Sequence, residues 1–372
     1  MSLDEKLETA LKKRRINKNL RKLSTAKGLI DFTSNDYLGL ARNEELSERI
    51  HHASGNLYNG SGGSRLLSGN TDLAEETEKY LAGLFESENT LIFNSGYMAN
   101  LAVFSALPQR GDTILYDELS HACIKDGIRL SMAGKYRFKH NDMDDLAARL
   151  KKAVGNVFIA VESVYSMDGD QCPLDELVEL ANAYNAKVII DEAHTTGVVG
   201  RNGGGLSMSR ELHHEVFARI YTFGKGMGIH GAAVAGSQVF IEYLINFARP
   251  FIYTTAPAPH SFIAIRESFR YLTSHPELQD KIAGRIAQFK TEFEKIADRF
   301  VYRESFHPVQ AILIPGNEQV TQASKKLSQD GFDVRPIFSP AVRTGSERIR
   351  ICLHTFNSAD EISSLIDSLA AL

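Results

Sequence analysis

Two short motifs in the middle of the chain carry residues that together can do one kind of chemistry. Lys225 lies in Thr222-Phe-Gly-Lys-Gly-Met-Gly228, and Asp191-Glu-Ala-His194 lies 31 to 34 residues before it, at the end of an apolar run. The glycines let the backbone and a flat ligand approach the Lys225 amine, which can form a Schiff base with an aldehyde. An aspartate at the carboxyl end of a parallel strand can keep a pyridine nitrogen protonated. The pair predicts a pyridoxal phosphate (PLP) enzyme.

A third motif is suited to holding a phosphate. Asn94-Ser-Gly-Tyr-Met-Ala-Asn100 follows an apolar run and opens a helical pattern. The free backbone N–H groups near Ser95, Gly96 and Tyr97 would point at an anion at the positive end of that helix. The alternative is an ordinary helix cap made by Ser95. Glu162-Ser-Val-Tyr-Ser-Met-Asp168 also begins at a strand end, and it is either a binding loop or a plain turn.

His121 and His194 are candidates for contact with the cofactor. An imidazole can stack on a planar ring or donate a hydrogen bond to a phenolate oxygen, although an ordinary hydrogen-bonded histidine is the alternative. The letters of the motif Asp191 to His194 also occur in helicases that hydrolyse ATP. Those enzymes need a GxxxxGK[ST] phosphate loop, and neither Gly134-Lys135 nor Gly224-Lys225 is followed by Ser or Thr. The helicase interpretation is therefore discarded.

Three further segments carry charge or glycine. Arg348-Ile-Arg350 alternates along a short apolar strand, so only one of the two guanidinium groups can face a site, where it would bind a carboxylate. Surface ion pairs are the alternative. The run Lys12 to Arg15 is interpreted as a solvated helix face. The segment Gly60 to Arg65 is interpreted as a flexible loop near the site, because it does not close a strand-to-helix turn.

Short runs rich in branched apolar residues alternate with helical patterns through the middle of the chain. This alternation predicts a largely parallel sheet covered by helices. The runs are 90–93, 113–116, 157–162, 187–191, 220–222 and 232–235. Between two of them, apolar residues from Leu174 to Tyr184 recur with a helical period after Pro173, which predicts a crossover helix.

From about residue 260 the pattern changes to a long amphipathic stretch, short strands and a terminal helix, which predicts a second lobe. Ser358-Ala-Asp-Glu361 has the form of a capping box before that last helix. At the other end, Leu3, Leu7 and Leu11 form a short amphipathic arm. We expect an N-terminal arm over 1–40, a large cofactor-binding domain over 41–255 and a small C-terminal domain over 256–372.

The composition is that of an ordinary globular protein. The chain has 372 residues, of which 43% are hydrophobic and 24% charged, so it is long enough for two lobes with cores. No apolar run approaches the roughly 20 residues of a spanning helix, and the first residues are polar, so a cytoplasmic protein without a membrane partner is expected. Cys123, Cys172 and Cys352 show neither a disulfide framework nor metal-ligand spacing, so no metal is expected. A net charge of -4 favours no nucleic acid partner.

Taken together, the ordered motifs resemble the α-oxoamine synthases, a family of PLP enzymes. The resemblance runs from end to end and implies the α/β fold type I of PLP-dependent transferases. That fold has a large domain with a mostly parallel seven-stranded sheet and a smaller α+β C-terminal domain. The motifs that carry it begin at Asn35 (NDYLGL), Gly60 (GSGGS), Leu119 (LSHA), His140 (HND), Ser166 (SMDGD), Asp191 (DEAH), Thr222 (TFGKG) and Arg348 (RIR).

The resemblance assigns a role to each matching residue. Lys225 would be the catalytic Schiff-base lysine, Asp191 would pair with the pyridine nitrogen, His194 would reach the phenolate oxygen, and His121 would stack on the ring. The other residues that would contact the cofactor are Ser95, Gly96, Tyr97, Ser166 and Thr222.

The resemblance also implies contacts to a neighbouring subunit and to the substrate for four more residues. Thr254 would touch the phosphate in a neighbouring subunit's site, which implies a homodimer with shared active sites. Arg21, Asn35 and Arg350 match positions that contact the substrate in relatives.

The implied reaction is a decarboxylative condensation of a small L-amino acid with an acyl-CoA or acyl-carrier-protein thioester. The motifs resemble most those of the members that join L-alanine to a pimeloyl thioester. Their product is 8-amino-7-oxononanoate, an intermediate of biotin biosynthesis. Members that use glycine or serine, and an aminotransferase of the same fold, stay open as alternatives. The chain departs from the pattern at Pro340-Ala-Val-Arg343, where Ala341 replaces a threonine, and between Arg21 and Asn35, which is short. Both segments are candidates for lining the acyl pocket.

Overall fold

The computed structural model describes residues 1–23, 25, 28–339 and 341–372. The chain divides into two compact units. The first, here called the terminal unit, joins both chain ends and comprises Met1–Ser34, Ser166–Asp170 and Lys281–Leu372. The second, here called the sheet unit, comprises Asn35–Tyr165 and Gln171–Asp280. The expected arm and two domains, over 1–40, 41–255 and 256–372, stay a prediction.

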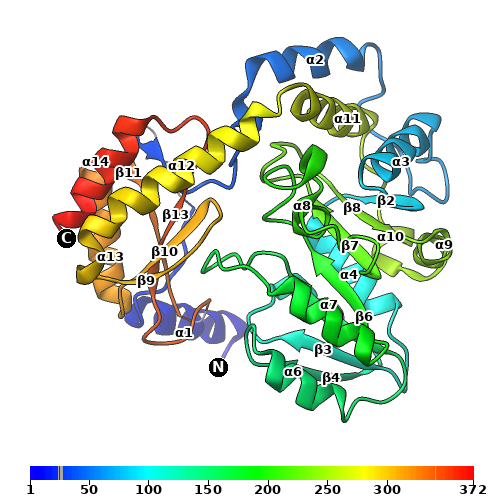
Figure 1. The fold of residues 1–372 in the computed structure, drawn as a ribbon, viewed down its shortest axis with the longest axis horizontal. Coiled ribbons are helices and arrows are strands. Elements are labelled where there is room, and N and C mark those ends of the chain that lie inside the picture. The colour runs from blue at the N-terminus through cyan, green and yellow to red at the C-terminus, as the bar shows by residue number, and fades with distance from the viewer. Residues whose placement is uncertain (24, 26–27, 340) are drawn as a thin grey trace. The chain divides into compact units, whose positions relative to one another are not determined.

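The sheet unit is built on a seven-stranded sheet in the order β2-β8-β7-β6-β5-β3-β4, shown in Figure 1. Neighbouring strands are parallel except at β8, which runs antiparallel to both β2 and β7. The mostly parallel seven-stranded sheet is thus confirmed. The strands are β2 (Asn89–Phe93), β3 (Thr113–Asp117), β4 (Gly134–Phe138), β5 (Val157–Glu162), β6 (Lys187–Asp191), β7 (Ala218–Thr222) and β8 (Ala232–Gly236).

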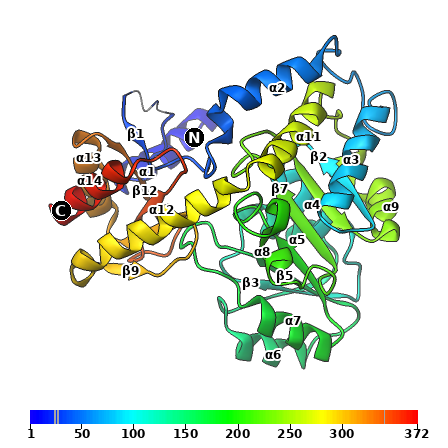
Figure 2. The same cartoon turned by 45° about the horizontal axis from the view of Figure 1, so that its top comes forward.

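Helices cover both faces of this sheet, as the two views in Figures 1 and 2 show. The central strands are apolar along their whole length because side chains alternate between two buried faces. In β6, Ile189 joins one core cluster, whereas Val188 and Ile190 join the other. The helices of this unit are α2 (Glu44–Ser54), α3 (Asp72–Leu84), α4 (Gly96–Ala106), α5 (Ala122–Leu130), α6 (Met143–Leu150), α7 (Leu174–Ala183), α8 (Gly205–Ser209), α9 (Gln238–Phe247), α10 (Arg249–Ile252) and α11 (Pro259–Ser274), with short 3-10 turns at η1 (Leu40–Arg42) and η2 (Arg201–Gly203).

The expected crossover helix is α7, which begins directly after Pro173. Its apolar stripe buries Leu174, Leu177 and Val178 against the sheet. Tyr184, which the periodicity placed in that stripe, instead follows the last helical residue and is 36% exposed. The stripe therefore ends one turn earlier than the sequence pattern predicted.

The terminal unit contains a four-stranded antiparallel sheet in the order β12-β13-β10-β9 and a short parallel pair, β1 and β11. The α12 helix continues from the sheet unit into this one. The strands are β1 (Ile30–Asp31), β9 (Val301–Arg303), β10 (Val309–Leu313), β11 (Phe332–Asp333), β12 (Arg335–Ile337) and β13 (Arg348–Cys352), and the helices are α1 (Leu3–Ile16), α12 (Glu277–Phe293), η3 (Glu294–Arg299), α13 (Asn317–Gln329) and α14 (Ala359–Ala370).

The two terminal helices form as the sequence predicted. Ser358 and Glu361 make both hydrogen bonds of the capping box that starts α14. The α1 helix carries Leu3, Leu7 and Leu11 on exposed positions. No described helix is long and apolar enough to cross a membrane. All three cysteines are unbonded to one another and buried, as expected.

Candidate active site

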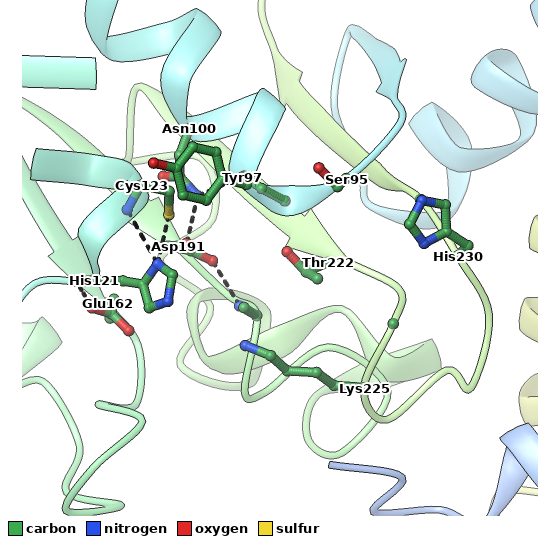
Figure 3. A pocket seen from close by; sticks show the side chains of 14 residues that line it. Ser95, Tyr97, Asn100, His121, Cys123, Glu162, Asp191, Thr222, Lys225 and His230 are labelled. Atoms are coloured by element: carbon green, nitrogen blue, oxygen red, sulfur yellow. Dashed lines mark hydrogen bonds between the residues drawn. The ribbon is translucent and has the colours of Figure 1, made fainter. Parts of the chain in front are cut away.

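A cavity of about 290 Å³ opens at the carboxyl ends of three adjacent parallel strands of the sheet unit. Glu162, Asp191 and Thr222 are the last residues of β5, β6 and β7, so neighbouring strands deliver one side chain each to the same edge. Figure 3 shows this pocket from close by. Its lining residues are Ser95, Gly96, Tyr97, Asn100, His121, Cys123, Glu162, Asp191, Ala193, Thr222, Gly224, Lys225, His230 and Gly231.

The start of α4 forms one wall of the pocket. Ser95 caps this helix, since its hydroxyl accepts a hydrogen bond from the backbone N–H of Met98 at 3.3 Å. A Cβ atom at Gly96 would lie only 2.1 Å from Oγ1 of Thr222, so this position has no room for any side chain. Helix α4 thus presents its amino end to the cavity, where backbone N–H groups and the helix dipole favour an anion.

Asp191 lies at the back of the cavity and is held by two hydrogen bonds. Its Oδ2 accepts from Nδ2 of Asn100 at 2.7 Å, and its Oδ1 accepts from the backbone N–H of Ala193 at 2.9 Å. Burial raises the pKa of Asp191, while the charge of Lys225 and these two hydrogen bonds oppose that rise. The role of Asn100 was not predicted from the sequence, although a polar side chain on a mostly apolar helix was an available signal.

Lys225 extends into the cavity from the loop that follows β7 (Figure 3). Its Nζ lies 2.9 Å from Nε2 of His194, which is only 4% exposed. On the other side of that ring, Nδ1 lies 2.7 Å from the hydroxyl of Tyr37. The Lys225 amine therefore contacts one ring nitrogen of His194, and Tyr37 contacts the other.

His121 stands at the start of α5 and is held by two neighbours. Its backbone N–H donates to Oε1 of Glu162 at 2.6 Å, and its Nδ1 accepts from the backbone N–H of Cys123 at 3.2 Å. Burial lowers the pKa of His121, which favours the neutral ring. Burial, with repulsion from Asp191, raises the pKa of Glu162 to about 8. Burial likewise raises the pKa of the Cys123 thiol, so this cysteine is unreactive.

The other predicted residues lie outside the lining of this cavity. Thr254 belongs to the sheet unit, where its Oγ1 accepts from Nδ2 of Asn94 at 3.3 Å. Asn35 is in the same unit and accepts a hydrogen bond from Tyr37. The loop 60–65 ends in Arg65, which makes two 2.8 Å hydrogen bonds to the carboxylate of Glu78, so its end is fixed.

The predicted carboxylate-binding arginine belongs to the terminal unit. Arg348 is buried in an ion pair with Asp168, whereas Nε of Arg350 donates to the backbone oxygen of Ser166 at 2.6 Å. Because Arg348 is held by a carboxylate, Arg350 remains the better candidate of the pair. Arg21 is an exposed residue of the same unit.

The segment that departs from the family pattern also lies in the terminal unit. The backbone N–H of Ala341 donates to the oxygen of Phe338 at 2.9 Å, so this residue closes a turn. Pro340, the first residue of the departing motif, lies outside the described residues.

Away from the cavity, one group among the described residues has the composition of a metal site. Ligand atoms of Glu86, His213 and His214 lie within 4.8 Å of one another. Arg201, however, already pairs with the carboxylate of Glu86, and Nε2 of His213 lies 3.2 Å from the same carboxylate. The group is therefore explained by the ion pair between Arg201 and Glu86 and the hydrogen bond from His213.

The residues of the cavity fit PLP. Asp191 offers an acceptor for a protonated ring nitrogen, the amino end of α4 suits a phosphate, and Lys225 offers an amine for the aldehyde. His121 lines the same cavity, and its ring offers a flat face for stacking. This fit agrees with the PLP interpretation of the Asp191 motif.

Comparison with known proteins identifies the family. The family model "Aminotransferase class I and II" matches residues 27–369. The chain belongs to this family. A curated 8-amino-7-oxononanoate synthase from Emericella nidulans is 38% identical over 393 residues, which cover 99% of this chain and 95% of that protein. The resemblance to the α-oxoamine synthases is thereby confirmed.

Two solved structures give the same fold. Serine palmitoyltransferase from S. paucimobilis, described with bound PLP, is 24% identical and has a TM-score of 0.92, with 100% of this chain and 98% of that chain covered. An 8-amino-7-oxononanoate synthase from Francisella tularensis is 29% identical and has a TM-score of 0.79, with 92% and 97% covered. Fold type I is confirmed.

Proposed function

We propose that this chain binds PLP and condenses L-alanine with a pimeloyl thioester to give 8-amino-7-oxononanoate, carbon dioxide and the free thiol. One arrangement carries the proposal: the Lys225 amine and the Asp191 carboxylate line the same cavity, at the carboxyl ends of parallel strands. Bound PLP supplies an aldehyde that takes up an amine and a ring that accepts electron density from the neighbouring carbon.

Each side chain around the cofactor ring has a separate role in binding or in proton transfer. Asp191 keeps a proton on the ring nitrogen, because the two hydrogen bonds from Asn100 and Ala193 hold its carboxylate in place. The start of α4 binds the phosphate. Lys225 would take the α-proton of the bound amino acid on Nζ, because its amine lines the same cavity.

The remaining site roles belong to the same proposal. His121 stacks on the ring, His194 lies at its phenolate side, and Ser166 and Thr222 complete the cofactor contacts. Thr254 contacts the phosphate of a partner subunit's site, which makes the enzyme a homodimer, placed in the cytoplasm. Arg350, Arg21 and Asn35 are the proposed substrate contacts, and Arg350 is the one assigned to the carboxylate.

Alanine and pimeloyl thioester are preferred because the full-length relatives are 8-amino-7-oxononanoate synthases. The serine palmitoyltransferase structure has the higher TM-score, but at 24% identity it supports the fold alone. The other candidates are 2-amino-3-ketobutyrate ligase, which uses glycine, and serine palmitoyltransferase. An aminotransferase, which consumes no thioester, is the candidate from a different reaction class.

A substrate panel tests the proposal. The purified protein with PLP is given alanine, glycine or serine with acetyl, pimeloyl or palmitoyl thioesters, each as the CoA and the carrier-protein form. We expect aminoketone, carbon dioxide and free thiol in equal amounts only with alanine and a pimeloyl thioester. Conversion of PLP to its amine form by an amino acid alone would show an aminotransferase instead.

The lysine role is tested in the same assay. Lys225→Ala removes the amine that binds the aldehyde and moves the α-proton, so product formation is abolished and the visible absorbance of the lysine-bound cofactor is lost. Lys135→Ala is a matched control, because Lys135 lies on the edge strand β4 and donates to the backbone oxygens of Ile128 and Arg129 at the end of α5, away from the cavity. A Lys225→Ala protein that kept near-normal turnover would contradict the mechanism.

A further inference from the structure

One histidine lines two neighbouring cavities of the sheet unit. His230 and Gly231 belong to the lining of the cofactor cavity and also to that of a second cavity of about 320 Å³. Among the described residues that line the second cavity, His230 has the one side chain that can carry a charge. The side chain is exposed, so a ligand can reach its ring at the boundary between the two cavities.

The register of the sheet places His230 beside the start of α4. Strands β2 and β8 are antiparallel, and Phe93 at the end of β2 pairs with Ala232 at the start of β8. Ser95 follows this pair by two residues on one segment, and His230 precedes it by two residues on the other. The segments stay close beyond the sheet, because a Cβ atom at Gly231 would lie 3.7 Å from the backbone oxygen of Phe93. His230 and Ser95, which caps α4, therefore lie on the same side of the pocket (Figure 3).

The end of β7 brings a hydroxyl group to the same place. Thr222 is the last residue of β7 and also pairs with Ala232, on the other edge of β8. Its Oγ1 would lie 2.1 Å from a Cβ atom at Gly96, so it directly adjoins the first turn of α4. The amino end of α4, the Thr222 hydroxyl and the His230 ring thus lie together at one end of the cofactor cavity.

A phosphate at this end requires more positive charge than the helix supplies. A phosphate monoester carries about −1.5 to −2 at pH 7, whereas a helix start is equivalent to roughly +0.5. Besides His230, the described lining residues include two side chains that can be cationic, Lys225 and His121. The Lys225 amine is assigned to the aldehyde, and burial lowers the pKa of His121. An imidazole donates a hydrogen bond to an anion and adds a positive charge when it is protonated, so His230 is suited to this end.

We propose that His230 is a cofactor-binding residue, which donates a hydrogen bond to a phosphate oxygen of PLP at the amino end of α4. The inference rests on the PLP site of the proposed function, and it does not depend on which amino acid or thioester reacts. Backbone N–H groups of α4 and one side-chain donor then hold the phosphate together. His230 thereby recognises the phosphate, whereas Asp191 and Lys225 serve the ring and the aldehyde.

Binding of PLP and of pyridoxal, which lacks the phosphate, tests this role. The full-length protein is dialysed free of cofactor, and each aldehyde is titrated while the visible absorbance of its lysine-bound form is followed. His230→Ala should raise the Kd for PLP about tenfold, the size expected for one hydrogen bond to a charged group, and should leave the Kd for pyridoxal unchanged. Equal weakening of both ligands, or an unchanged Kd for PLP, would overturn the proposal.

His52→Ala serves as the control for loss of an exposed imidazole. His52 is also an exposed histidine of the sheet unit, in the last turn of α2, and it is not among the described lining residues of either cavity. This variant should bind both aldehydes as the wild type does. A loss of PLP affinity as large as that of His230→Ala would show that the effect does not come from the phosphate end of the cavity.

Thermal unfolding separates binding from folding. Without cofactor, His230→Ala should unfold at the wild-type Tm, because the exposed ring is not part of the core. At one fixed concentration of PLP, the rise in Tm should be smaller in this variant than in the wild type, since the rise follows the ratio of ligand concentration to Kd. An equal rise in both proteins would contradict the phosphate contact.

The same titration distinguishes failure of this inference from failure of the proposed function. A wild-type protein that gave no absorbance of lysine-bound cofactor with PLP would refute the proposed function. A wild type that binds PLP, together with a His230→Ala variant of unchanged Kd, would refute only the role of His230.

Discussion

Asp191 and Glu162 stand opposite each other in the register of β6 and β5, and both end their strands in the same cavity. Burial raises the pKa of Asp191, but its two hydrogen bonds and the nearby charge of Lys225 oppose that rise and favour the negative charge. Glu162 accepts from the backbone of His121, and burial with repulsion from Asp191 raises its pKa to about 8. Neighbouring strand ends thus hold one carboxylate for charge and one carboxyl group that keeps its proton.

The largest effect should come from removing the charge at the end of β6. Asp191→Asn keeps the shape but cannot stabilise a proton on the ring nitrogen, so kcat should fall by about 10²- to 10³-fold, the loss seen when one electrostatic contact is removed from an active site. Steady-state assay of aminoketone formation measures this. If Glu162→Gln lost as much activity as Asp191→Asn, the division of tasks between the two strand ends would be wrong.

A smaller fall in kcat should follow from removing one of the two hydrogen bonds that hold the Asp191 carboxylate. Asn100→Ala removes one hydrogen bond to a charged group, worth about 1.5–3 kcal/mol, so kcat should fall about 10- to 100-fold. Asn246→Ala is a control, because Nδ2 of Asn246 donates to the backbone oxygen of Glu242 in its own helix α9. The absorbance of bound cofactor over a pH series shows whether the ring nitrogen has lost its partner. Unchanged kcat in Asn100→Ala would mean that Ala193 alone holds the carboxylate.

The smallest effect concerns stability at the end of β5. The folded pKa of Glu162 is about 8, above the ordinary value of 4.5, so the folded protein binds this proton more tightly than the unfolded chain. The stabilisation of the folded state by this proton is complete below pH 4.5 and is lost as pH rises toward 8. Glu162→Gln should therefore show a flatter fall of Tm than wild type across this window. Parallel curves from thermal unfolding would contradict the protonated state of Glu162.

The sequence predicted the buried strands well because continuous apolar runs are required by a sheet covered on both faces. It missed β4, whose Lys135, Tyr136 and Arg137 are exposed at the sheet edge, so the run is not apolar. Lys225 and Asp191 could be predicted because their chemistry is specific. The bond from Asn100 to Asp191 joins residues 91 apart, and pairing at that separation depends on which strands become neighbours.

The lack of space for a side chain at Gly96 has a consequence for binding of the cofactor. A Cβ atom at this position would lie 2.1 Å from Oγ1 of Thr222, so a larger residue would require the start of α4 or the Thr222 side chain to move. The backbone N–H groups at that helix start are the proposed phosphate ligands, so a shift of the helix would displace them. Substitution of Gly96 should therefore be detected first as weaker retention of the cofactor.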